Sequence, residues 1–198
     1  MKIQEDKLYS YKMKHDYGFA PNPFLGVLTL ATCKPGMRRN TQIGNWIAGW
    51  TSNHMVRSLG VGENELIYLA KVTDKLTFAE YWEEYPQKRP VFTDDKDDIK
   101  RYGDNIYKPD DSASGGFVQI KNSHHNNCKE DDDLSGRYVL ICKEFYYFSS
   151  LASLPIPPEL SPNIPKSQTC YGVITEDVSE FINYVRLYSK FCKYTDAK

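Results

Sequence analysis

Short apolar runs and alternating patterns dominate this chain and predict a sheet-based core. Residues 9–14 alternate between apolar and polar side chains, and residues 25–32 form an apolar run that ends at a Cys-Lys-Pro-Gly turn signal. Residues 66–72 are almost continuously apolar, as is typical of a central strand. Residues 138–142 predict one more strand, and the aromatic residues 145–148 continue its edge.

A further strand is predicted over residues 43–51. Because side chains alternate across a strand, Trp46, Ala48 and Trp50 would lie on one face, opposite Ile47 and Gly49. The spacing therefore predicts two indoles side by side.

Two helices are predicted. Thr77 or Asp74 can cap a short one near 77–84. The clearest pattern covers 176–193, with Thr175 as its cap and an apolar face that includes Phe181. The fold class we expect is α+β, with a mixed or barrel-like sheet.

The length of 198 residues and the absence of an internal repeat predict a single domain over 1–198. Within it, residues 86–137 are polar and predict a loop-rich insertion, and the prolines of 154–165 predict an extended connector.

Composition excludes several classes. With 25 Lys+Arg against 26 Asp+Glu, the net charge of −1 argues against a surface wrapped by a polyanion, although a local basic groove stays open. No apolar run reaches the roughly 18 residues of a membrane span. The charged first seven residues lack a signal-peptide core, so we expect a cytoplasmic protein. The 14% aromatic content supplies core mass or stacking surfaces.

Five cysteines, without a Cys-x-x-Cys pair, argue against a disulfide framework or a thiolate zinc site. Cys142 and Cys192 stand in apolar patterns and are expected to be buried. Cys33 follows a strand and precedes Lys34, a setting that can activate a thiol. No sequence motif supplies a base for this thiol, so we favour a non-catalytic role for Cys33.

Several blocks carry a family resemblance. The chain resembles a nucleotide modification associated domain, a family of phages and bacteria, in 11–24, 30–35, 38–39, 43–47, 103–107 and 145–148. The resemblance implies a protein of a bacterial cell or a phage-infected host that is linked to nucleic-acid base modification, without catalytic residues attached. Residues 42–47 and 65–72 are also similar to paired strands of PUA-like modules, although Gly44-Asn45 stands where those usually have Gly-Asp.

Within the matching blocks, Trp46 and Trp50 could form a slot for a base, or both could be core residues. Lys34, Arg38 and Arg39 form the densest basic cluster, which suits a phosphate or a solvated surface patch equally well.

His15 and Asp16 open a loop stiffened by two prolines. An Asp-oriented imidazole could act as a general base, or the pair could fasten the loop. Phe19 and Asn22 in the same loop are candidates for contacts with a base.

A second candidate patch is 102–107. Tyr102 and Tyr107 can stack, while Asp104 and Asn105 offer an acceptor and a donor for a base edge or a ribose hydroxyl. Asp104 is also a candidate general base, and the pair is equally a good turn.

Adjacent histidines diverge in a strand, so His124 and His125 with Cys128 predict a mobile polar loop rather than a metal site, although one of the two could reach another site. The phosphate-loop, dinucleotide-binding, zinc-protease and serine-hydrolase motifs are absent from the sequence.

The favoured function is binding of a nucleotide, a modified base or nucleic acid, with Lys34, Arg38 and Arg39 on a phosphate. Alternatives are an enzyme using His15 with Asp16, or Asp104, as its base, capture of a small signalling nucleotide, and a protein-interaction domain. The sequence predicts no particular cofactor.

Overall fold

A computed structural model of the chain describes residues 7–95, 98–125, 130–167 and 172–191. The chain divides into two compact units. The first unit comprises Met1–His15, Gly44–Lys71 and Phe145–Lys198, and the second comprises Asp16–Ile43 and Val72–Glu144. The chain thus leaves the first unit twice, and both excursions build the second. The expectation of a single domain stays a prediction.

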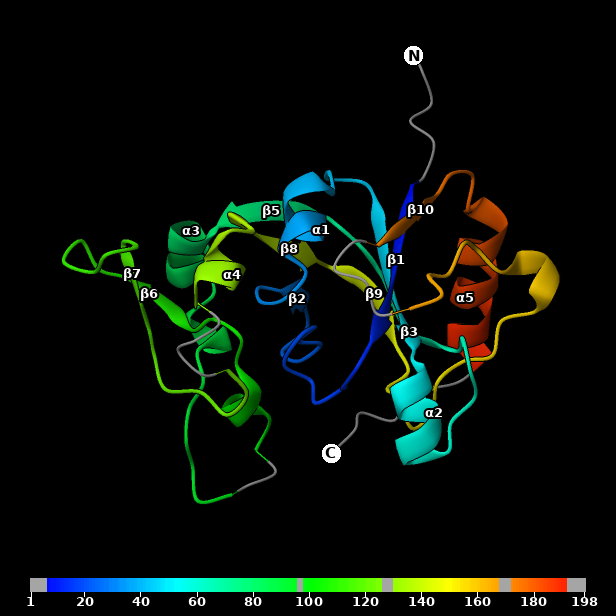
Figure 1. Ribbon diagram of the computed structural model, residues 1–198, viewed down its shortest axis with the longest axis horizontal. Helices are drawn as coiled ribbons and strands as arrows, with labels where there is room; N and C mark the ends of the chain where they lie inside the picture. The colour runs from blue at the N-terminus through cyan, green and yellow to red at the C-terminus, as the bar shows by residue number, and fades with distance from the viewer. Residues whose placement is uncertain (1–6, 96–97, 126–129, 168–171, 192–198) are drawn as a thin grey trace, which may run out of the picture. The chain divides into compact units, whose positions relative to one another are not determined.

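The first unit is built on a five-stranded sheet in the order β10-β1-β3-β4-β9 (Figure 1). Strand β1 (Leu8–Met13) runs parallel to β3 (Trp46–Thr51) and antiparallel to β10 (Val173–Thr175), so the sheet is mixed. Strand β4 (Leu66–Lys71) lies between β3 and β9 (Glu144–Tyr147), which confirms its predicted central position. Helix α2 (Asn53–Leu59), which the pattern did not predict, connects β3 to β4.

A hydrophobic core cluster of the first unit lies on one face of this sheet. Trp46, Ala48 and Trp50 share that face, as their spacing predicted, and they pack with one side of helix α5 (Ser179–Phe191). The Trp50 ring stacks on Phe181 of this helix at 5.8 Å. The prediction of the helix was right but its start was wrong, because Thr175 ends strand β10 and Asp177 has a left-handed φ of 53°. The predicted end at 193 lies outside the described residues.

The Pro-rich segment 154–165 is mostly irregular, as predicted. A single bridge pairs Leu154 with Leu66 of β4, and Pro158–Leu160 forms a 3-10 turn, η4. Among the described residues, no helix is long and apolar enough to span a membrane.

The second unit contains a three-stranded sheet in the order β2-β8-β5 and a β6-β7 hairpin. Its elements are β2 (Leu28–Leu30), α1 (Pro35–Asn40), β5 (Asp74–Thr77), α3 (Phe78–Glu84), η1 (Pro86–Lys88), η2 (Ile99–Tyr102), β6 (Tyr107–Pro109), β7 (Phe117–Gln119), α4 (Glu130–Leu134) and β8 (Tyr138–Cys142). Helix α3 begins with a full capping box between Thr77 and Glu80, which confirms the predicted short helix. The predicted apolar run 25–32 shortens to β2, because Leu25 and Gly26 form a turn with positive φ.

The α+β class is therefore confirmed, with a mixed sheet rather than a barrel. Within the described residues the strands form three open sheets, and none closes on itself.

A buried ammonium group organises the first excursion of the chain. Lys88, at the end of η1, is 0% exposed, and its Nζ donates to Asn22 Oδ1 at 2.6 Å, Phe24 O at 2.6 Å, Val27 O at 2.7 Å and Asn22 O at 3.2 Å. Burial lowers the pKa of Lys88 to about 8, although the charge of Asp104 opposes the shift. The ammonium group is therefore still charged at neutral pH. It connects the Pro-rich loop of residues 15–24 to the second excursion.

Replacing Lys88 by Met is expected to lower the free energy of unfolding by about 3–5 kcal/mol, because four oxygen acceptors, three of them in buried hydrogen bonds, lose their donor. Urea denaturation followed by circular dichroism measures the change. The matched control is Lys100→Met at an exposed lysine, expected to change stability by less than about 0.5 kcal/mol. Equal stabilities of the two variants would contradict the assigned role of Lys88.

Candidate active site

The feature that stands out chemically in the second unit is an exposed cysteine on a constrained turn. Cys33 follows β2 and has a φ of 61°, and Lys34 has a φ of 45°. Residues other than glycine rarely adopt this left-handed backbone conformation. Both backbone groups of Cys33 are held: its N–H donates to Asp133 Oδ1 at 2.6 Å, and its carbonyl accepts from Arg38 Nε at 2.8 Å. The turn leaves the thiol exposed to solvent.

A histidine from the second excursion reaches this thiol. The Nε2 atom of His125 lies 3.7 Å from Cys33 Sγ, although the two residues are 92 positions apart. The other ring nitrogen, Nδ1, lies 2.8 Å from Asp133 Oδ2 as an ion pair. The imidazole thus stands between a thiol and a carboxylate.

The carboxylate of Asp133 is the centre of this arrangement. It lies in α4, is 2% exposed, and accepts from the hydroxyl of Tyr107 at 2.8 Å in addition to its contacts with Cys33 and His125. Its two oxygens therefore fix the backbone of the cysteine and the ring of the histidine together.

Arg38 supports Asp133 from the core. The guanidinium is 0% exposed, and it donates to the carbonyls of Cys33, Tyr138 and Asp133. A Cβ atom at Gly136 would collide with the guanidinium, so a larger residue there would displace Arg38 from its hydrogen bonds. Arg38 is therefore part of the scaffold that holds the cysteine turn against α4.

The two neighbouring histidines have opposite electrostatic environments. Burial opposes the charge on His125, but Asp133 and Cys33 outweigh it and raise the pKa of His125 to about 9. Burial, with the neighbouring His125, lowers the pKa of His124. At neutral pH His125 is therefore an imidazolium, while His124 is a neutral aromatic ring.

A thiol, an imidazole and a carboxylate in this order form the constellation of covalent catalysis by cysteine. The thiolate is the nucleophilic form of a cysteine, and the imidazole is the group 3.7 Å from this sulfur that can exchange a proton with it. The same imidazolium is within reach to protonate a leaving group, and Asp133 is placed to orient it.

Comparisons with known proteins agree with the resemblance seen in the sequence. A family profile described as nucleotide modification associated domain 2 matches residues 5–196. The chain belongs to this family. Searches of curated proteins and of solved structures gave no significant match.

In this nucleotide modification associated domain, the indoles predicted to form a slot are core residues. Trp46 and Trp50 are both 0% exposed and belong to the core of the first unit. The alternative of core packing therefore accounts for both. An aromatic slot on this strand would need an open face, which the packing with α5 removes.

Other predicted site residues are buried and already paired. Asp104 is 0% exposed and accepts from Thr29 and Tyr81, which differs from the role of a general base in contact with substrate. The amide of Asn22 donates to Tyr102 O and accepts from Lys88, and that of Asn105 donates to Tyr81 O and Tyr85 O. Their hydrogen bonds hold the loops.

The basic cluster separates in the same way. Arg38 is buried, contrary to both of its predicted surface roles, because its donors satisfy backbone carbonyls in the core. Arg39 is exposed and donates to Ser135 O, and Lys34 is half-buried on the cysteine turn. Lys34 and Arg39 as phosphate ligands remain predictions.

His15 is exposed in the first unit, where its ring meets His54 edge-on at 5.2 Å. Its predicted partner Asp16 is half-buried and begins the second unit. Their role as a catalytic pair remains a prediction.

Three predicted residues do meet the new site. Tyr107 donates to Asp133, Phe19 packs its ring 5.1 Å from His125, and Tyr102 stacks on His124. The sequence suggested that one histidine of the pair could reach a site, but it identified neither His125 nor Asp133. Cys128 lies outside the described residues, so the expectation that 124–128 holds no metal stays a prediction.

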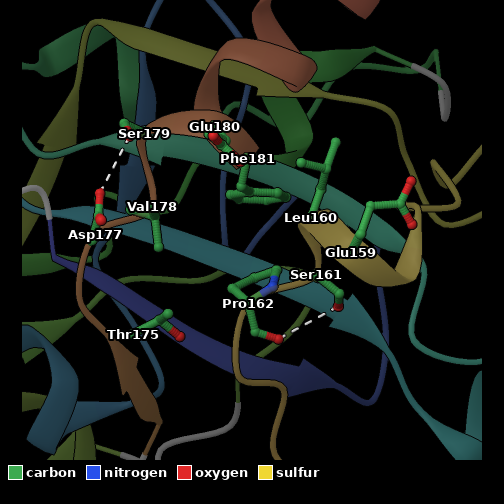
Figure 2. Close-up of a pocket in the computed structure, with 10 residues that line it drawn as sticks. All are labelled: Glu159, Leu160, Ser161, Pro162, Thr175, Asp177, Val178, Ser179, Glu180 and Phe181. Atoms are coloured by element: carbon green, nitrogen blue, oxygen red, sulfur yellow. Dashed lines mark hydrogen bonds between the residues drawn. The ribbon is translucent and has the colours of Figure 1, made fainter.

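A pocket of about 320 Å³ occurs in the first unit, where η4 meets the start of α5 (Figure 2). Glu159, Asp177 and Glu180 are among its lining residues. Three carboxylates would repel a phosphate, so this hollow does not suit an anionic nucleotide.

The stability of the protein is expected to report the charge on His125. Because the folded-state pKa of about 9 lies above the ordinary value near 6.5, the charged ring of His125 with its partners Asp133 and Cys33 contributes roughly 3 kcal/mol below pH 6.5, and this is lost as pH rises through 9. The measurement is the difference in free energy of unfolding between wild type and His125→Gln from pH 6 to 10. The titration of Lys88 changes the free energy of unfolding in the opposite direction. It does so equally in wild type and in the variant, so it cancels in the difference. A pH-independent difference would contradict the charged pair.

Proposed function

We propose that the protein is a cysteine-dependent enzyme that acts on a nucleotide or a modified nucleobase by acyl transfer. Cys33 is the nucleophile, His125 is its acid and base, and Asp133 positions the imidazole. The observation that carries the proposal is the Cys33–His125–Asp133 arrangement, with contacts of 3.7 Å and 2.8 Å across the ring.

The reaction we propose proceeds in two steps. The Cys33 thiolate attacks the carbonyl carbon of an acyl group on an exocyclic base amine, the C–N bond breaks, and the amine leaves with the proton of His125. This forms a thioester on Cys33. Water then attacks the thioester while His125 accepts its proton, which releases the carboxylic acid and restores the cysteine. An amine acceptor in place of water gives acyl transfer.

Membership of a nucleotide modification associated family supports the choice of substrate class. Nucleotide binding, the function that the sequence favoured, becomes the first step of this proposal. A pure binding protein, such as one that captures a small signalling nucleotide, does not require a thiol next to an imidazolium and a carboxylate. The arrangement therefore favours the enzyme.

The first test is the reactivity of Cys33 toward iodoacetamide at pH 7, located by peptide mapping. We expect alkylation in wild type to be about tenfold faster than in His125→Gln, because the imidazole 3.7 Å from the sulfur is the group placed to exchange the thiol proton. Loss of the ring also uncovers the sulfur, so a slower rate has no steric explanation. His54→Gln, at an exposed histidine of the first unit, is the control and should react like wild type. Equal rates in wild type and His125→Gln would overturn the role of His125.

The second test uses an acylated nucleotide, N4-acetyl-2′-deoxycytidine monophosphate. Intact-mass spectrometry of the mixture is expected to show an acetyl group on wild-type protein, and chromatography should show release of the deacylated nucleotide. Both signals should vanish in Cys33→Ser, whereas Cys142→Ser, at a fully buried cysteine, should retain them. Deacylation that survives in Cys33→Ser would contradict a cysteine nucleophile.

A further inference from the structure

Three rings of the second unit lie nearly parallel next to the Cys33–His125–Asp133 arrangement, which we call the triad. Tyr17 stacks on His124 with ring centroids 5.5 Å apart and planes at 13°, and Tyr102 stacks on His124 at 5.5 Å and 21°. The three rings come from the Pro-rich loop, η2 and the segment before α4. We call them the ring stack. Tyr17 is 58% exposed, so a large aromatic surface faces solvent.

The ring stack is joined to the triad through Phe19. The Phe19 ring is buried and lies 5.0 Å from the His124 ring and 5.1 Å from the His125 ring. His124 also precedes His125 in the chain. The ring stack and the acid–base group therefore contact the same buried ring, that of Phe19.

Two cations lie close to the ring stack along the chain. Arg101 and Lys121 both stand over the ring of Phe92, at 5.3 Å and 4.8 Å from its centroid. Arg101 is the neighbour of Tyr102, and Lys121 is three residues before His124, a reach of at most about 10 Å. Lys121 is exposed and forms no ion pair with a carboxylate among the described residues. Its ammonium group is available to an anion.

We propose that the ring stack is a subsite for an unpaired nucleobase and that Lys121 and Arg101 take the attached phosphate. The inference rests on the proposed function, and it defines the substrate as a nucleotide unit with its base exposed. Flat aromatic faces bind bases of any sequence by stacking, while cations on a neighbouring ring attract the phosphate. A base inside a duplex has both faces covered, so the substrate is a free nucleotide or a nucleotide of a single strand.

The binding test uses the full-length Cys33→Ser protein, which holds a ligand without turnover. The probes are the four 2′-deoxynucleoside monophosphates, the matching nucleosides, and single-stranded hexanucleotides, with Kd measured by calorimetry. Tyr17→Leu is expected to weaken nucleotide binding about tenfold, and Tyr17→Trp is expected to retain it. Tyr188→Leu, at a partly exposed tyrosine of α5, is the control and should not change Kd.

The phosphate part of the proposal has its own variant. Lys121→Gln is expected to weaken the monophosphates about fivefold and to leave the nucleosides unchanged. Tighter binding of hexanucleotides than of monophosphates would identify the source of the substrate as a single strand, and the reverse order would identify a free nucleotide. Either order agrees with the subsite.

Unchanged Kd values in Tyr17→Leu, or the absence of any binding at millimolar concentration, would overturn the subsite. The alkylation test needs no ligand, so the two proposals fail separately. Loss of His125-dependent alkylation with intact Tyr17-dependent binding would leave a binding site without the enzyme. The opposite pattern would leave an enzyme whose substrate binds elsewhere. Near-ultraviolet circular dichroism of each variant, together with the Tyr17→Trp rescue, distinguishes a lost contact from a lost fold.

Discussion

One buried carboxylate holds the candidate site together. Asp133 accepts from the backbone of Cys33 and from the hydroxyl of Tyr107, and it pairs with the ring of His125. A buried charge is expensive unless each of its oxygens is satisfied, and here the donors that satisfy it are themselves the parts of the site. The geometry of the nucleophile and of its acid–base partner therefore depends on the same group that must be neutralised for the fold to be stable.

The second unit relies on such buried polar groups because its chain arrives in two separate excursions. Its sheets are short, with strands of three to five residues. Lys88 joins the first excursion to the second through Asn22, and Arg38 does the same through Tyr138 and Asp133. These contacts connect irregular loops to the core, and a catalytic arrangement needs this kind of support from the residues around it.

The pair of adjacent histidines shows how environment divides two identical side chains. His125 faces a carboxylate and carries a charge at neutral pH, whereas His124 lies among aromatic rings and stays neutral. The first suits proton transfer and the second suits stacking. Because the two are neighbours in the chain, the chemistry proposed for Cys33 and the base proposed for the ring stack lie side by side.

The local pattern of the sequence was enough for the longer strands and for helices α3 and α5, whereas α1, α2, α4, β5, β6 and β10 were not predicted. The alternation in β3, the apolar run of β4 and the capping box of α3 depend on interactions within a few residues, so they could be predicted without the fold. The family resemblance could also be recognised, because it rests on contiguous segments of the sequence.

The candidate site could not be predicted from the local sequence in the same way. Cys33 could be recognised as a reactive type of residue on a turn, but its base lies 92 residues away in a polar stretch without periodicity. In the acidic run of 130–133, Asp131 and Asp132 are exposed and Asp133 is buried, a choice that depends on which side of α4 faces the core. Burial also decided that Trp46, Trp50 and Arg38 belong to the scaffold. The sequence by itself determined the longer strands, helices α3 and α5, and the family. Only the tertiary structure brought thiol, imidazole and carboxylate together, because contacts between distant segments leave no local pattern.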